Sequence, residues 1–171
     1  MRASRSSGPR AHPGHAGHAG HGGPPAPVVG TYITEVKLPA IVDYILAAKR
    51  AAGALGLVVG FSLQEIDELN IAVTQACENA IAAANEQWGR GNGQLKLLFK
   101  TQPRRLEVEV RSVPPRAVEM QQAVRPARRA EAVDYESVGV NMIRLFVDEL
   151  RYHRDQQTGI MRMRMVKYLI E

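Results

Sequence analysis

The sequence predicts an α+β domain in which a mostly antiparallel sheet of about five strands carries three helices on one face. Short segments that alternate apolar and polar residues form one single strand and two hairpins. Two long helical patterns stand between the single strand and the first hairpin, and a third precedes the second hairpin. A chain of 171 residues with 45% apolar residues is long enough for one domain with its own core.

The first half of the domain is expected to hold a strand, two helices and a hairpin. Their expected ranges are 31–38, 39–55, 63–88, 94–101 and 105–113. Pro39 suits the first position of a helix, and Gly56 is expected to end that helix. Ser62 and Glu65 have the spacing of a capping box at the start of the second helix.

The second half begins with a stretch rich in Pro, Arg and Ala, residues 114–136, which is expected to be a loop. Ser137 or Gly139 is expected to open a third helix that runs to about Glu149. A last hairpin is expected over residues 150–154 and 159–169. Met and Arg alternate in its second strand, which is typical of a strand with one buried face.

Residues 1–28 consist almost entirely of Gly, Pro, Ala, His, Ser and Arg, a composition that predicts a disordered tail before a domain over residues 29–171. Four histidines recur at every third position and could bind nickel, copper or zinc. They are His12, His15, His18 and His21. The simpler interpretation is a low-complexity leader without a dedicated metal.

Charge and cysteine content point to a soluble, cytoplasmic protein. Cys77 is the single cysteine, so no internal disulfide can form, and no apolar run predicts a secretory signal or a membrane span. The formal net charge is +5, and seven arginines fall within residues 104–129. Such a patch can attract nucleic acid or an acidic protein, or it can be a solvated loop of mixed charge.

Residues 66–81 resemble the nucleotide helix of the GHKL (histidine kinase-like ATPase) superfamily. They are most similar to the anti-sigma-factor serine/threonine kinases of the RsbW and SpoIIAB type. Residues 106–111 resemble the strand before the family's first glycine box, residues 138–152 its second glycine box and helix, and residues 165–169 its last strand. The resemblance implies the histidine kinase-like ATPase fold, a site for ATP with magnesium, and a protein partner.

The resemblance also implies roles for residues on the nucleotide helix. Asn79 stands where the family has its magnesium ligand, and Gln75 stands where the family has the glutamate that acts as general base. A carboxamide can hold a hydroxyl but cannot take its proton, so catalysis at Gln75 is expected to be lost. Glu78 lies about 100° round the helix from Asn79 and is expected to point elsewhere.

The glycine boxes are altered as well. Ser112 occupies the position of the adenine-binding aspartate, and Pro114 and Arg116 replace the glycines that follow it. A serine can accept only a neutral hydrogen bond, which should cost about 1 kcal/mol of adenine affinity. In the second box the expected nucleotide-binding residues are Gly139, Val140 and Asn141, with Asn141 in place of a glycine.

These residues predict an anti-sigma-factor-type regulatory protein of a bacterial partner-switching pathway. It would bind a sigma factor or an anti-sigma antagonist and have weak or lost kinase activity. The alternative is an active serine/threonine kinase that uses Mg–ATP through Asn79. A nucleic-acid or metal-binding module is a third hypothesis, and the scarcity of aromatic residues counts against single-stranded nucleic acid. A homodimer could form by edge pairing of the strand at Thr31.

Overall fold

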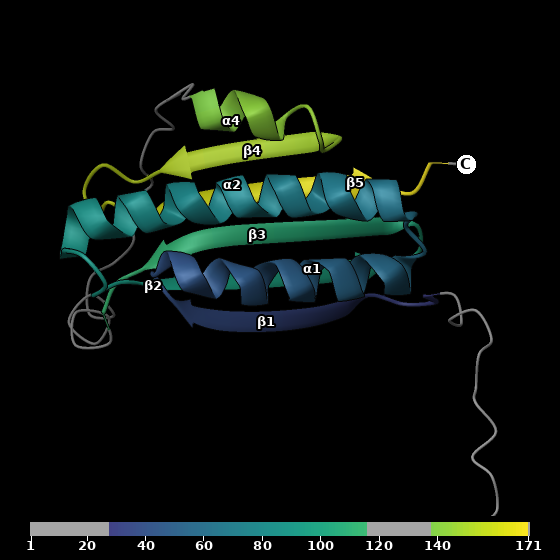
Figure 1. Cartoon of the computed structure of the whole chain (residues 1–171), viewed down its shortest axis with the longest axis horizontal. Coiled ribbons are helices and arrows are strands. Elements are labelled where there is room, and N and C mark those ends of the chain that lie inside the picture. The colour runs from purple at the N-terminus through teal and green to yellow at the C-terminus, as the bar shows by residue number, and fades with distance from the viewer. Residues whose placement is uncertain (1–27, 116–137, 171) are drawn as a thin grey trace, which may run out of the picture.

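The computed structural model describes residues 28–115 and 138–170 of the chain. Its elements are β1 (Tyr32–Pro39), a 3₁₀ turn η1 (Val42–Tyr44), α1 (Ile45–Val59), α2 (Leu63–Trp88), β2 (Gln94–Gln102), β3 (Arg105–Val113), α4 (Val138–Ile143), β4 (Glu149–Arg154) and β5 (Met161–Tyr168). The strands form one antiparallel sheet in the order β1-β2-β3-β5-β4. Figure 1 shows α1 and α2 side by side in front of this sheet, with α4 at the β4 end.

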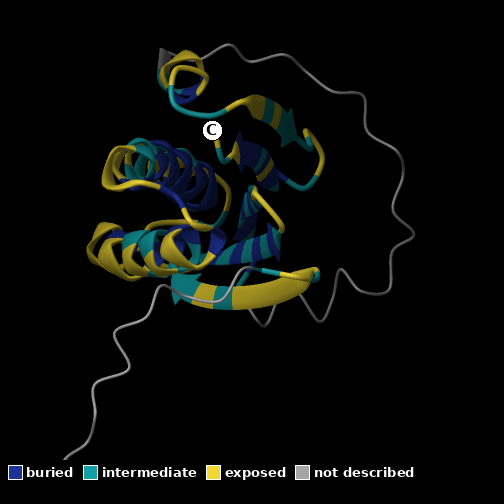
Figure 2. Cartoon of the chain, turned by 90° about the vertical axis from the view of Figure 1, so that its right-hand side faces the viewer, coloured by how far each residue is buried: buried dark blue, intermediate teal, exposed yellow. Residues whose placement is uncertain are grey.

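The sheet buries one face against the helices, and Figure 2 shows α1 and α2 on that side. Leu97 and Phe99 of β2 and Val108 of β3 are wholly buried, and they pack in one cluster with Leu69 and Val73 of α2. Every second residue of β2 and β3 is buried in this way, which is why both strands alternate in sequence. The predicted fold class is confirmed.

Local signals predicted several elements correctly. The helix that begins after Ser62 has the predicted bounds and a complete capping box. The Ser62 hydroxyl accepts a hydrogen bond from the Glu65 amide at 3.3 Å, and the Glu65 carboxylate accepts one from the Ser62 amide at 2.7 Å. Both hairpins form where they were expected. In β5, Met161, Met163 and Met165 face the core, as the Met–Arg alternation predicted.

The predicted bounds of the first helix were wrong at both ends. Pro39 is the last residue of β1, opposite Gln94, and the helix starts only at Ile45. Gly56 lies inside the helix, where a Cβ would stand 3.2 Å from the Ile66 side chain, so this glycine permits close packing. The helix ends at Gly60, whose φ of 101° is a left-handed conformation that suits glycine.

The third helix is shorter than predicted, because α4 ends at Ile143. The amide of Asp148 donates a hydrogen bond to the carbonyl of Val166 at 2.9 Å, and Glu149 opens β4 against β5. Sheet pairing therefore takes over the segment that was expected to be helical. The predicted loop over 114–136 lies almost entirely outside the described residues. None of the described helices is long and apolar enough to cross a bilayer.

Candidate functional site

The middle of α2 and the start of α4 bring three predicted site residues together. Gln75 and Asn79 lie one turn apart on α2, and Gly139 of α4 rests directly on them. A Cβ at position 139 would stand 3.2 Å from Asn79 Oδ1 and 3.2 Å from Gln75 Nε2. Such a contact would be tighter than nine in ten real Cβ contacts, so the absence of a side chain at residue 139 lets the two helices meet closely at this point.

The other predicted residues of the second glycine box do not converge on this point. Val140 is buried in the hydrophobic core, and Asn141 is exposed to solvent. Asn79 itself is half-buried, and its Nδ2 atom is buried without a hydrogen-bond partner among the described residues. The contact between α2 and α4 therefore holds one unsatisfied amide donor beside the backbone of Gly139.

Glu78, which was predicted to point away from Asn79, lies beside Gln75 on α2. Gln75 Nε2 donates a hydrogen bond to Glu78 Oε2 at 3.1 Å. The residues are three apart on one helix, a spacing that brings side chains into contact and that could have identified the pair. A carboxylate therefore contacts the carboxamide that occupies the position of the family's general base.

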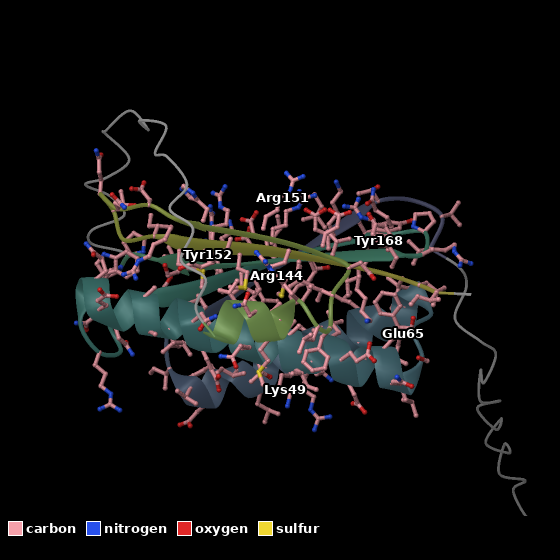
Figure 3. The ribbon with its side chains drawn as sticks, turned by 90° about the horizontal axis from the view of Figure 1, so that it is seen from above. Lys49, Glu65, Arg144, Arg151, Tyr152 and Tyr168 are labelled. Carbon is pink, nitrogen blue, oxygen red and sulfur yellow. The ribbon has the colours of Figure 1, made fainter. Side chains whose placement is uncertain are left out.

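A groove of about 610 Å³ extends from this pair along the outer side of α2, next to α1. Its lining residues are Lys49, Asp67, Asn70, Ile71, Thr74, Gln75 and Glu78. Figure 3 shows Lys49 on the helix side of the molecule. The groove offers one cation and two carboxylates, and beneath it the Oδ1 of Asn70 is buried without a hydrogen-bond partner among the described residues. Such a lining suits a polypeptide with both donors and acceptors.

Ser112 is fully buried and has a structural contact. Its hydroxyl accepts a hydrogen bond from the backbone N–H of Met161 at 2.9 Å. Pro114, which follows shortly after, is also buried. The hydroxyl at the predicted adenine position therefore completes the hydrogen bonding at the start of β5.

Lys167 is a site residue that sequence reasoning missed. It is buried, and its Nζ donates to Glu68 Oε2 at 2.8 Å and to the carbonyl of Phe146 at 3.1 Å. This contact ties the segment after α4 to α2, and the hydrogen bond from Lys167 lowers the pKa of Glu68. The alternation of β5 places residue 167 on the core face, which could have revealed it.

Cys77 is buried in α2 and contributes no thiolate to this site. Burial raises the pKa of the Cys77 thiol to about 12, so its thiolate is not available near neutral pH. Arg116 and the four histidines of the tail lie outside the described residues.

The family model of the histidine kinase-like ATPase domain matches residues 38–165. The chain belongs to this family. Among curated relatives, the serine-protein kinase RsbW of Bacillus subtilis (strain 168) is 29% identical over 140 residues, which cover 79% of this chain and 84% of RsbW. RsbW of Bacillus pumilus (strain SAFR-032) is 30% identical over 78 residues, 46% of this chain and 48% of that protein. The predicted resemblance to RsbW-type proteins is confirmed.

A solved structure shares the fold. It is the crystal structure of the RsbU and RsbW domains of Rv1364c from Mycobacterium tuberculosis, with a TM-score of 0.55 and 13% identity. The match covers 81% of this chain and 32% of that chain, so the present chain spans about a third of the solved one. At this identity the likeness shows the fold alone.

Membership of an ATPase family implies a site for ATP with magnesium. The described residues at the expected positions are poorly suited to bind Mg–ATP. Asn79 offers an amide oxygen, yet the Ser112 hydroxyl is engaged by Met161, and Pro114 has no N–H to offer. Gln75 stands where a carboxylate is needed for proton transfer. Within residues 28–115 and 138–170 there is no cluster of three His, Cys, Asp or Glu side chains that could hold a metal ion.

Proposed function

We propose that this chain is a cytoplasmic anti-sigma-factor-type regulatory protein of a bacterial partner-switching pathway. It binds a protein partner, a sigma factor or an anti-sigma antagonist, and its ATP-dependent kinase activity is weak or lost. The observation that carries the proposal is the environment of Ser112, which stands at the adenine position, is wholly buried and accepts a hydrogen bond from the Met161 amide. The scaffold of the RsbW-like proteins is intact around it.

Partner binding is supported by the groove along α2. Gln75 lies at its end, and a carboxamide can donate to and accept from a partner hydroxyl. Lys49, Asp67 and Glu78 supply charges of both signs along the groove. These groups can orient a polypeptide without any transfer of a phosphoryl group.

The ATP affinity of the chain is expected to be at least about tenfold weaker than that of the Bacillus subtilis RsbW relative. Loss of the charge-assisted bond to adenine accounts for about 1 kcal/mol, and the rigid Pro114 adds to it. Isothermal titration calorimetry of both proteins with millimolar Mg–ATP measures the difference. An affinity equal to that of RsbW, abolished by Asn79→Ala, would instead support the alternative of an active Mg–ATP-dependent kinase.

We also propose a homodimer through β1, which is an edge strand of the sheet. If two β1 strands pair antiparallel about Val36, Glu35 of each copy lies opposite Lys37 of the other. Both side chains are partly exposed. Glu35 already pairs with Lys96 at 2.6 Å and with Lys37 at 3.7 Å within its own chain, and the dimer would add a contact to Lys37 of the second copy. Sedimentation velocity should show a dimer that Lys37→Glu weakens and Glu35→Lys/Lys37→Glu restores. A monomer at every concentration would refute the pairing.

A further inference from the structure

The sheet face opposite the helices carries a row of basic side chains that crosses all five strands. The strand register places Lys37 opposite Lys96, and Lys96 opposite Arg111. It then places Arg111 opposite Arg162, and Arg162 opposite His153. We call these five residues the basic row. At the usual spacing of neighbouring strands the row is about 19 Å long.

The alternation of the strands fixes the side on which the basic row lies. Leu95 and Leu97, on either side of Lys96, are wholly buried toward the helices, so Lys96 points the other way. Figure 3 shows the same separation, with Arg151 of β4 on the side of the sheet away from the helices and Lys49 among them. The basic row and the groove on α2 therefore lie on opposite sides of the molecule.

This face has twice as many basic side chains as carboxylates. The basic ones are Lys37, Lys96, Lys100, Arg105, Arg111, Arg151, Arg162 and Arg164, and the carboxylates are Glu35, Glu107, Glu109 and Glu149. Glu35 pairs with Lys96 at 2.6 Å, and Glu109 pairs with Arg162 at 3.5 Å. No ion pair is recorded for Arg111 or Arg151 with any described carboxylate.

Like charges directly opposite each other destabilise a sheet. The basic row contains three such contacts in succession, Lys37 with Lys96, Lys96 with Arg111, and Arg111 with Arg162. Arg151 and Arg164 form a fourth beside it. Glu35, Glu109 and Glu107 offset part of this repulsion by pairing with Lys96, Arg162 and Arg164. Arg111 and Arg151 have no such pair with a described carboxylate, and an anionic partner would supply one.

We propose that the basic row binds an acidic polypeptide segment that lies across the strands. Guanidinium groups pair with carboxylates through two parallel hydrogen bonds, so Arg111 and Arg162 suit Asp and Glu side chains. Glu35 and Glu109 lie in the adjacent row, and a polypeptide can space its carboxylates to meet only the basic row, whereas a phosphate backbone brings continuous charge against both rows. The basic row holds one ring, the imidazole of His153, and the adjacent row holds none, so the surface offers little on which bases could stack. This contact surface is independent of the function proposed for the helix side.

The test uses fluorescently labelled poly-L-glutamate, the full chain and anisotropy at low ionic strength. The variant Arg111→Gln/Arg151→Gln is expected to bind at least about tenfold more weakly than the native chain. The matched control is Arg50→Gln/Arg90→Gln, which removes the same charge from exposed positions outside the sheet. Its binding is expected to stay within about twofold of native, because net charge alone does not determine the contact.

The melting temperature and the binding of duplex DNA distinguish a specific contact from misfolding or general charge attraction. The melting temperature of Arg111→Gln/Arg151→Gln should equal or exceed that of the native chain, because the change removes three like-charge contacts. Equal losses of binding in both double variants, or a lower melting temperature that accompanies the loss, would overturn the proposal. The proposal would also be overturned if duplex DNA bound more tightly than poly-L-glutamate and this binding depended on Arg111 and Arg151.

Discussion

Phosphorylation of its protein partner by this chain is expected to be at least about a hundredfold slower than the reaction of the Bacillus subtilis RsbW relative on its own substrate. Gln75 stands at the position of the family's general base, and a carboxamide cannot take a proton from a hydroxyl. Gln75 also donates a hydrogen bond to Glu78, so its amide group is held by a neighbour. Single-turnover transfer of labelled γ-phosphate measures both rates.

Gln75→Glu separates the causes of this loss. A rise of about a hundredfold in the variant would assign the loss to the missing carboxylate alone. If the rate of Gln75→Glu did not rise, the loss would also be assigned to the adenine position, where Ser112 accepts a hydrogen bond from Met161 and Pro114 is buried. A native rate within about tenfold of RsbW would contradict the expectation, because a missing general base costs more than that.

Lys167→Met is expected to lower the free energy of unfolding by about 2 kcal/mol. The lysine side chain is 6% exposed and bonds both the Glu68 carboxylate and the Phe146 carbonyl. Methionine fills a similar volume but leaves both acceptors without their donor. Urea unfolding measures the change, and Arg50→Met, at an exposed position of α1, is the control with an expected change below about 0.5 kcal/mol.

The destabilisation caused by Lys167→Met should depend on pH. The hydrogen bond from Lys167 holds the pKa of Glu68 below its ordinary value of 4.5. The stabilisation from a lowered carboxyl pKa is present above that ordinary value and is lost as the pH falls through the folded value. The difference between native and variant should therefore be full near neutral pH and shrink in acid. If the stability difference between the native chain and Lys167→Met stayed constant down to the pH of acid unfolding, the Lys167–Glu68 pair would not be its cause.

Local sequence signals determined much of the fold. The capping box of Ser62 and Glu65 fixes the start of α2, and the alternation in both hairpins follows from one buried sheet face. The start of α1 could not be predicted in this way. Pro39 suits the first turn of a helix and the end of an edge strand alike, and only its pairing with Gln94 decides between them. Gly56 is likewise explained by packing against Ile66, which the local sequence does not reveal.

The candidate site was predicted only where residues are close in sequence. The four-residue spacing of Gln75 and Asn79 places them on one face of α2. The contact of Gly139 with both residues and the bond from Met161 to Ser112 join segments that are far apart in the chain. The basic row takes one residue from each strand, so it exists only through the register of all four strand pairs.

The central claim is that this chain regulates by binding a protein partner rather than by phosphorylating it. The most direct measurement is the affinity of the chain for its purified partner, by calorimetry, with and without millimolar Mg–ATP. Because Ser112 and Gln75 no longer offer the nucleotide chemistry, the two dissociation constants should agree within about threefold. A change of tenfold or more on addition of Mg–ATP, with phosphate on the partner, would contradict the account.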